Sequence, residues 1–182
     1  MGLDVSTTTA GWAIFDNLEA RPIMGFISLG KEESLYEKAD KFKIEIDKIL
    51  KKYNVDEVFL EEDLQRFSKG KSSSAVLQKL SRFNGMASFI VFQLLGKPPV
   101  HINVNVARRL VGCKIDKTDK TLSVKEKVLQ WSETAPFVSD YPWPTKVILS
   151  GKRKGEIVKI KEVGDMLDAY IVAHAGHLQL VK

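Results

Sequence analysis

The chain has 182 residues, of which 44% are hydrophobic and 28% are charged. This length suits one compact domain over residues 1–182 with a substantial core, and it excludes a second domain of ordinary size. Lysine and arginine exceed aspartate and glutamate by 28 to 23, which gives a formal charge of +5 at pH 7. So small an excess permits a polyanionic partner without requiring one.

The compartment is indicated by what the sequence lacks. Cys113 is the single cysteine, so an internal disulfide is excluded and a reducing compartment is favoured. No apolar run approaches the roughly 20 residues that span a bilayer. The N-terminus has no charged-then-apolar secretion signal. We therefore expect an intracellular, cytoplasmic protein with no membrane partner and no small-molecule cofactor.

The first third of the chain predicts strands and then a helix. Strand-like apolar runs occupy residues 2–5, 10–15 and 23–29. Only the polar turn Ser6–Thr9 separates the first two runs, which favours an antiparallel hairpin. A helical period begins after Ser34, and Glu37 three residues later completes a capping-box pattern. This helix is expected to continue to Tyr53.

The rest of the chain predicts alternating strands and helices. Strands are expected at 58–60 and 99–102, and helices at 74–95, 104–111, 121–132 and 165–180. Two apolar segments flank G-K-R-K-G and predict a hairpin with a basic tip at 146–160. This order of elements implies an α/β fold, with one mixed five-stranded sheet and helices on both faces.

The placement of carboxylates carries the strongest functional signal. Asp4 and Glu61 each end an apolar strand, while Asp165 and Asp168 lie at i and i+3 on an apolar helix and so point the same way. Buried acids are costly to desolvate, and clustered acids raise one another's pKa. A divalent cation would offset both costs, and oxygen ligands suit Mg²⁺ or Mn²⁺. Two such ions can support phosphodiester hydrolysis.

Each acid also has an ordinary structural explanation. Taken singly, an acid after a strand is more often a turn former, and Asp165 could be the cap of the last helix. The functional prediction therefore depends on the whole set, because four acids in this order, each at an element boundary or an inner face, are hard to produce by chance.

The residues around these acids resemble a known family. The segments G-L-D-V-S-T-T-T-A-G-W-A, V-F-L-E and G-D-M-L-D-A-Y-I-V-A are similar to the three acidic motifs of RuvC-type Holliday-junction resolvases, in the same order and over nearly the whole chain. The resemblance implies an RNase H-like fold, a homodimer, two Mg²⁺ ions per site (Mn²⁺ being possible) and symmetric nicking of four-way DNA junctions. It places the catalytic, metal-binding acids at Asp4, Glu61, Asp165 and Asp168.

Two details refine the resemblance. Asp-Val-Ser stands where bacterial members of the family have Asp-Pro-Gly, which indicates a phage or viral member acting in the host cytoplasm. Glu61 and Glu62 compete for the second acidic position, because adjacent side chains of a strand point to opposite faces. Glu61 directly follows the apolar triplet, as in the family, and is preferred; Glu62 is the alternative.

Basic residues gather in three clusters that follow the acid-bearing strands. A single lysine is better explained as a solvated surface residue, but three clusters in such positions favour phosphate contacts. In related resolvases basic residues after the fifth strand contact the junction, which makes Lys117 and Lys120 the first candidates. The clusters are Arg66, Lys69 and Lys71; Arg108, Arg109, Lys114, Lys117 and Lys120; and Lys152, Arg153 and Lys154.

Other polar and aromatic residues have two interpretations each. Phe67, in the loop after Glu61, could stack on a base at the crossover or pack beneath its own loop. The hydroxyls of Ser6–Thr9 could orient a phosphate or simply form a turn. His174, which precedes His177 on the last helix, is better explained as a core or surface residue than as a metal ligand.

The helix at 74–95 is apolar on more than one face. Phe83, Met86, Phe89, Phe92 and Leu95 cannot all face one sheet. A homodimer interface would cover the apolar side chains of this helix that do not face the sheet. Within a single chain, the first helix or the hairpin at 146–160 could cover it instead.

Three other functions compete with junction resolution. The first motif also resembles the phosphate-binding hairpin of actin-like sugar kinases, but those enzymes are far longer. Another RNase H-like nuclease with a different DNA or RNA substrate would have the same fold. A catalytically inactive junction-binding protein is the third, and the four retained acids argue against it.

Overall fold

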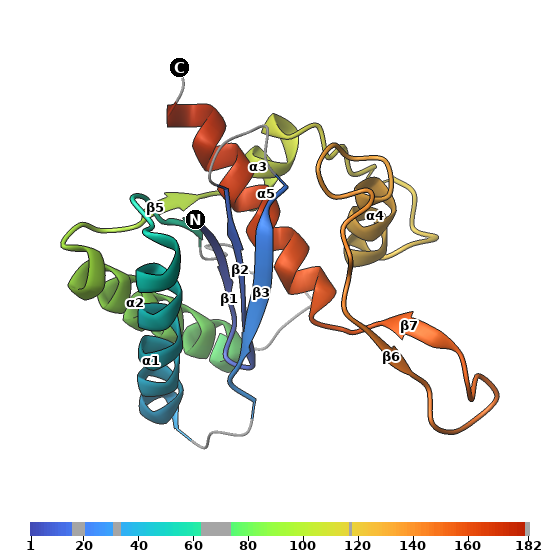
Figure 1. The fold of residues 1–182 in the computed structure, drawn as a ribbon, viewed down its shortest axis with the longest axis horizontal. Coiled ribbons are helices and arrows are strands. Elements are labelled where there is room, and N and C mark those ends of the chain that lie inside the picture. The colour runs from blue at the N-terminus through green and yellow to red at the C-terminus, as the bar shows by residue number, and fades with distance from the viewer. Residues whose placement is uncertain (16–20, 31–33, 63–73, 117, 181–182) are drawn as a thin grey trace.

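The described part of the chain forms one mixed sheet with strand order β3-β2-β1-β4-β5 (Figure 1). The computed structural model describes residues 1–15, 21–30, 34–62, 74–116 and 118–180. The strands are β1 (Gly2–Val5), β2 (Thr9–Ile14), β3 (Ile23–Ser28), β4 (Phe59–Glu61) and β5 (Val100–Ile102). β1, β2 and β3 pair antiparallel, whereas β4 pairs parallel with β1 and with β5. The predicted α/β fold with a mixed five-stranded sheet is confirmed.

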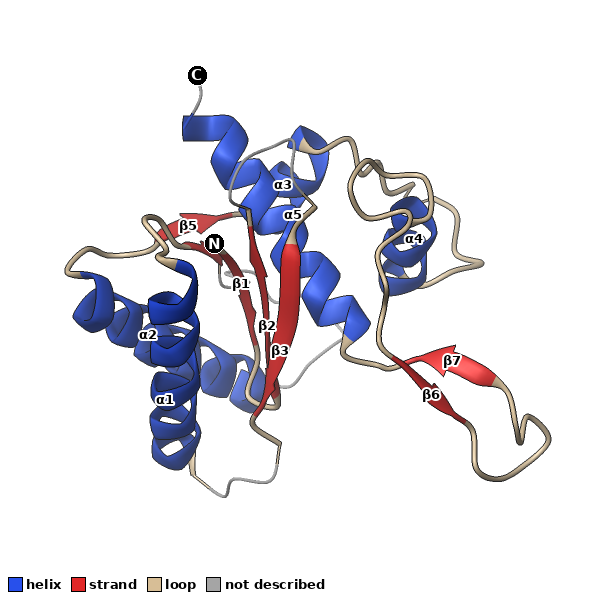
Figure 2. Cartoon of the chain, in the orientation of Figure 1, coloured by secondary structure: helices blue, strands red, loops and turns tan. Residues whose placement is uncertain are grey.

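Helices cover both faces of this sheet, as predicted (Figure 2). α1 and α2 pack together on one face, and α5 crosses the other beside α3 and α4. The predicted capping box at Ser34 and Glu37 is formed. The helices are α1 (Leu35–Tyr53), α2 (Ser74–Leu95), α3 (Val104–Leu110), α4 (Val124–Ser132) and α5 (Val163–Leu180).

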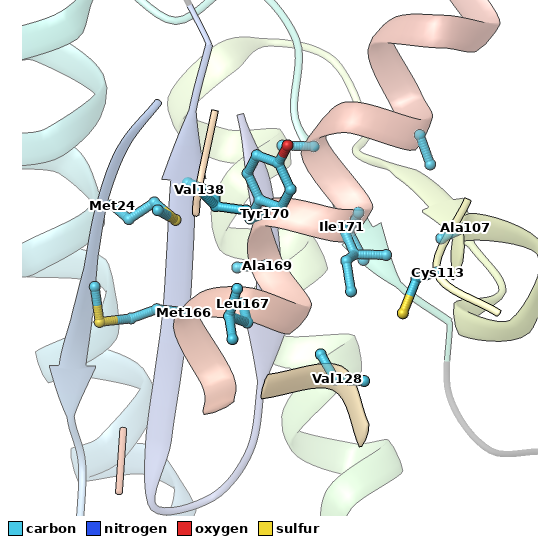
Figure 3. Packing of buried hydrophobic residues seen from close by; sticks show 14 of the residues in the cluster. Met24, Ala107, Cys113, Val128, Val138, Met166, Leu167, Ala169, Tyr170 and Ile171 are labelled. Carbon is cyan, nitrogen blue, oxygen red and sulfur yellow. The ribbon is translucent and has the colours of Figure 1, made fainter. Parts of the chain in front are cut away.

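The period-2 alternation of the strands divides the described core into two parts. Leu3 and Leu60 face α1 and α2, where they join a fully buried cluster with Phe42. The opposite core centres on α5, whose Tyr170 and neighbouring side chains pack beside Met24, Val138 and Val128 (Figure 3). Because the central strands are buried on both faces, they read as short, wholly apolar runs in the sequence.

Two glycines bring α5 into direct contact with the sheet. A Cβ at Gly11 would lie 2.1 Å from the carbonyl oxygen of Asp165, and one at Gly2 would lie 2.3 Å from that of Ala169. Real Cβ atoms do not approach backbone so closely, so only glycine fits at either position. The helix backbone therefore rests on β1 and β2, which fixes the height of the α5 acids above the strands.

A separate hairpin projects from the body of the molecule (Figure 1). It is formed by β6 (Thr145–Val147) and β7 (Ile157–Lys159), which pair antiparallel within the segment expected to form a basic hairpin. It lies away from α2, so α1 is the element that covers part of the apolar surface of that helix. On α2, Phe83 is buried, while Phe89 is 58% and Phe92 45% exposed.

None of the helices in the described ranges has the length and apolar character needed to cross a membrane.

Candidate active site

Strand pairing sets Asp4 beside Glu61. Gly2 pairs with Phe59 and Leu3 with Leu60 in the parallel β1–β4 ladder. Continuing this register by one residue places Asp4 next to Glu61 at the carboxyl ends of the two strands. Leu3 and Leu60 point into the core under α1 and α2, so the alternating side chains of Asp4 and Glu61 point to the α5 face.

The other two acids come from the N-terminal part of α5. This helix begins at Val163, two residues earlier than expected, so Asp165 lies in its first turn. The interpretation of Asp165 as the helix cap is therefore wrong. Asp168 follows one turn later and is buried, with 7% of its surface exposed. Acids at i and i+3 share one face of a helix, and here that face looks towards the ends of β1 and β4.

All four predicted acids line one cavity of about 370 Å³. Strands β1 and β4, the turn after β1, and helices α2, α4 and α5 contribute its walls. The lining residues are Asp4, Val5, Ser6, Glu61, Glu62, Leu77, Leu80, Ser81, Asn84, Lys125, Asp165 and Asp168. The structure thus brings together acids that are 164 positions apart in the sequence, from Asp4 to Asp168.

Crowding makes two of these carboxyl groups weak acids. Burial, followed by the negative charges of Glu61, Asp168 and Asp165, raises the pKa of Asp4 well above its usual value. Burial, and then the charge of Asp168, raises the pKa of Glu61 to about 7. A side-chain hydrogen bond joins Glu61 to Asp4 and partly opposes that rise. The pair therefore retains a proton at pH values where exposed carboxyls are ionised.

Two basic side chains pair with the α5 acids. The Arg108 Nη2 atom lies 2.9 Å from Asp168 Oδ1, and the Lys125 Nζ atom lies 3.0 Å from Asp165 Oδ1. Burial opposes the charge on Lys125, but the hydrogen bond and the nearby acids outweigh it, so the pKa of Lys125 is raised. Arg108, expected on an open DNA-binding surface, instead directs its guanidinium into the site, where its buried Nε atom has no hydrogen-bond partner among the described residues.

The two adjacent glutamates have different surroundings. Asn84, on α2, donates from Nδ2 to the Glu61 carbonyl oxygen at 3.1 Å. Glu62 also lines the cavity, and its Oε2 accepts a hydrogen bond from Asn103 Nδ2 at 3.2 Å. The geometry agrees with Glu61 as the partner of Asp4. Its catalytic role stays a prediction.

The donor set fits a hard divalent cation by its chemistry. Carboxylate oxygens are the ligands that such ions prefer, and their mutual repulsion is the cost that an ion would remove. Within the described ranges, however, no three side chains of the His, Cys, Asp or Glu types are already arranged as a metal site. Arg108 and Lys125 each contact the Oδ1 atom of their partners, Asp168 and Asp165, and so compete with a metal ion for these two carboxylates.

The raised carboxyl pKa values predict that the metal-free protein loses stability as pH rises. Glu61 has an ordinary pKa of 4.5 and a folded-state pKa of about 7. Between these values the folded state binds more protons than the unfolded state, so the free energy of unfolding falls with increasing pH. The contribution of Glu61 to this change in the free energy of unfolding is at most about 3 kcal/mol, because its side chain faces a cavity in which solvent screens the charge. Asp4 acts in the same direction.

Urea unfolding in EDTA at pH values from 5 to 8 measures this dependence. An Asp4→Asn variant should show a shallower slope, because one of the two coupled groups no longer titrates. A free energy of unfolding that rises through this window in EDTA would contradict the assigned crowding.

The predicted DNA-binding residues divide into three groups, the first of which is Arg108, paired with Asp168 in the site. Arg66, Phe67, Lys69, Lys71 and Lys117 lie outside the described residues. Arg109, Lys114 and Lys120 are exposed on α3 and on the segment between α3 and α4. Lys127 on α4 contacts two residues of the segment between α3 and α4. Its Nζ atom donates to the Asp116 carbonyl oxygen at 2.7 Å and lies 3.1 Å from Asp119 Oδ2.

The residues with two interpretations take structural positions. The Ser6 hydroxyl donates to the Thr9 carbonyl oxygen at 2.8 Å and accepts from the Thr9 amide at 3.0 Å, so it forms the β1–β2 turn. His174 packs between Phe15 and Tyr170 and does not line the acidic cavity. Burial lowers its pKa. Core packing accounts for His174, whereas Ser6 both forms the turn and lines the acidic cavity, so its contact with a phosphate stays a prediction.

Sequence reasoning missed Lys125 and Asn84. Lys125 lies in the first turn of α4, where a positive charge interacts unfavourably with the helix dipole. A lysine at such a position indicates that its side chain has a partner elsewhere. Asn84 is a buried amide on the apolar face of α2, and a buried polar group normally has a specific partner. Neither signal identifies the partner.

The sheet order, the flanking helices and the strand-end acids define an RNase H-like α/β fold. Among solved structures the chain is similar to Thermus thermophilus RuvC in complex with a Holliday junction substrate, with a TM-score of 0.63 and 14% identity over 98% of this chain and 93% of that one. A second Thermus thermophilus RuvC structure has a TM-score of 0.58 and 14% identity, over 99% and 95% of the two chains.

This likeness establishes the fold. No known protein family matches the chain by sequence, and no curated protein is found as a relative. These two neighbours come from Thermus thermophilus, so the expected phage or viral source finds no support in them and stays a prediction.

Proposed function

We propose that this chain is a structure-selective endonuclease that resolves four-way DNA junctions by paired, metal-dependent phosphodiester hydrolysis. The observation that carries the proposal is the convergence of Asp4, Glu61, Asp165 and Asp168 on one cavity. The fold supports it, since a neighbour with the same fold is described in complex with a Holliday junction substrate.

The four acids would hold two Mg²⁺ ions, with Mn²⁺ as a possible substitute. Bound there, the ions would supply positive charge to the reacting phosphate and lower the pKa of water. Arg108 and Lys125 balance the charge of the acids in the metal-free protein. Lys125 is a charge-assisted donor that lines the cavity, so a phosphodiester that enters can replace the Asp165 carboxylate as its partner.

The backbone of the DNA would be bound by basic residues outside the cavity. Arg109, Lys114 and Lys120 are exposed on elements that flank α5, and α3, which carries Arg109, also carries Arg108 into the site. Arg66, Phe67, Lys69, Lys71 and Lys117 remain candidates from the sequence. Contacts of this kind position the DNA without reading its sequence.

A homodimer would supply two sites for two symmetry-related nicks. Its proposed interface includes the exposed part of α2, where Phe89 and Phe92 lie 6.4 Å apart between ring centroids. Packing of α1 against α2 covers only part of the apolar surface of that helix.

A cleavage assay tests the function. A mobile four-way junction, a linear duplex and an RNA–DNA hybrid are each incubated with Mg²⁺ or with EDTA. We expect Mg²⁺-dependent nicks at symmetry-related positions of the junction, with both nicks made within one bound complex. Preferred cleavage of the hybrid would instead identify another RNase H-like nuclease, which is the alternative that shares this fold.

A further inference from the structure

The projecting hairpin accounts for most of the net positive charge of the chain. We define the arm as residues 144–160, which comprise β6, β7 and the loop between them. The arm contains five basic residues and one acid, so its formal charge is +4, against +5 for all 182 residues. The acid, Glu156, is paired with Arg153 at 2.7 Å. The remainder of the chain is therefore almost neutral, and its attraction for a polyanion is concentrated on the arm.

One face of the arm is apolar and exposed. Val147 pairs with Ile157 across the two strands, so their side chains share a face. Leu149 follows two residues after Val147, just beyond the end of β6 and towards the tip of the arm. Leu149 is 82%, Ile157 71% and Val147 51% exposed, so the fold of the protomer leaves all three largely uncovered. Exposed apolar groups in a row beside a basic tip indicate a binding surface.

The tip of the arm is built to hold one shape. The amide of Ile148 donates to the Glu156 carbonyl oxygen at 2.9 Å, and the Gly155 amide donates to the Ile148 carbonyl oxygen at 2.8 Å. Gly151 and Gly155 have φ values of +82° and +92°, which glycine adopts without strain. A preformed loop binds without a large ordering cost.

The base of the arm is closed by local contacts, and the chain passes from it directly into α5. The Ile160 amide donates to the Pro144 carbonyl oxygen at 3.0 Å, and Lys159 Nζ lies 5.9 Å from the centroid of the Trp143 ring. Three residues after Ile160, α5 begins, and its first turn carries Asp165. Figure 1 shows the arm leaving the body at the N-terminal end of α5, and Asp165 at that end of the helix lines the cavity. The arm and Asp165 are therefore connected to the same end of α5.

We propose that the arm is a branch-recognition element, in which Leu149, Ile157 and Val147 pack against bases exposed at a DNA branch point while Lys152, Arg153 and Lys154 contact the phosphates. This inference rests on the proposed function. Aliphatic side chains can insert between base steps that are already unstacked, and a branch point provides such steps, whereas an intact duplex must be deformed first. The apolar face thus adds affinity selectively for branched DNA, and the charges add affinity for any DNA.

Two arm variants separate these contributions. The apolar variant is Leu149→Ser with Ile157→Thr, and the charge variant is Lys152→Gln, Arg153→Gln and Lys154→Gln. Tyr36→Ser on α1, where Tyr36 is 79% exposed, is the matched control for loss of a surface apolar group. Fluorescence anisotropy in EDTA measures the binding of a four-way junction and of a linear duplex over a range of salt concentrations. A 2-aminopurine base at the branch point reports unstacking.

We expect the apolar variant to bind the junction about tenfold more weakly and the duplex unchanged, with the salt slope retained. Its 2-aminopurine signal should fall below that of the wild type. The charge variant should bind both DNAs more weakly, with a salt slope reduced by about 0.9 for each lost phosphate contact. The Tyr36→Ser variant should match the wild type in every measurement.

Other outcomes overturn the inference. If the apolar variant binds the junction as the wild type does, or loses junction and duplex equally, the arm does not recognise the branch. If that variant alters only the sedimentation coefficient, or only binding to vesicles that contain phosphatidylserine, the apolar face serves a second copy of the chain or a lipid surface. Failure of the wild type to bind any DNA would instead refute the proposed function itself.

Discussion

Replacing Asp4 by Asn is expected to abolish junction cleavage while making the metal-free protein more stable. Asn preserves the shape of the side chain but removes a charge that a divalent cation requires, so the rate should fall on the order of 10³-fold or more. Asp4 is also the acid whose pKa is raised by burial and by three neighbouring acids. Removing its charge relieves that repulsion, so the free energy of unfolding in EDTA at pH 8 should increase.

Asp168→Asn should be equally inactive but less stable. The carboxylate of Asp168 is the hydrogen-bonded partner of Arg108, and their side chains are only 11% and 15% exposed. Removing one member of a buried ion pair leaves the other charge uncompensated, which costs about 3–5 kcal/mol in fully buried cases and somewhat less here. The two variants therefore share a loss of catalysis and differ in the sign of their stability change.

Single-turnover cleavage, junction binding and urea unfolding together check both variants. Asp40→Asn, an exposed position on α1, is the matched control and should leave all three measurements unchanged. Retained cleavage in Asp4→Asn and Asp168→Asn would remove the acids from the mechanism. Glu61→Gln and Glu62→Gln extend the test: activity in Glu61→Gln with none in Glu62→Gln would assign the second position to Glu62.

The elements of the fold were predictable because their signals are local. Successive side chains of a strand point to opposite faces of the sheet. Because Leu3 and Leu60 face the core, Asp4 and Glu61 must lie on the opposite face. The capping box at Ser34 marked the start of α1 from a spacing of three residues. The acids could be identified because a carboxylate at the end of an apolar strand is unusual wherever the strand lies in the sheet.

The partners of the acids could not be predicted, because they depend on how separate helices meet. Lys125 reaches Asp165 from α4, and Arg108 reaches Asp168 from α3, across separations of 40 and 60 residues. In the sequence, Arg108 looks the same as Arg109 beside it. Only the packing of α3 on α5 turns one guanidinium into the site and leaves the other exposed. Nothing in the local spacing distinguishes them.

Gly11→Ala is expected to damage both the fold and the site through a single added methyl group. A Cβ at this position would lie 2.1 Å from the Asp165 carbonyl oxygen and 2.4 Å from its carbonyl carbon. These are backbone atoms of a helix that also packs on β1, so they cannot move aside as a flexible side chain could. The cost in free energy of unfolding should be about 3 kcal/mol or more.

The same clash acts on catalysis, because Gly11 pairs with Asp4 across β1 and β2. Any folded Gly11→Ala protein must hold the first turn of α5 farther from the strand, which separates Asp165 from the other acids. Gly85→Ala is the matched control: Gly85 is exposed in the middle of α2, and a Cβ there meets nothing within 4 Å. That variant should gain about 0.5–1 kcal/mol from helix propensity, and it is the control for stability alone, because Gly85 shares a helix face with Phe89 and Phe92 of the proposed dimer interface. Urea unfolding and junction cleavage measure both variants, and equal stability of the two would show that α5 does not rest on β2 at Gly11.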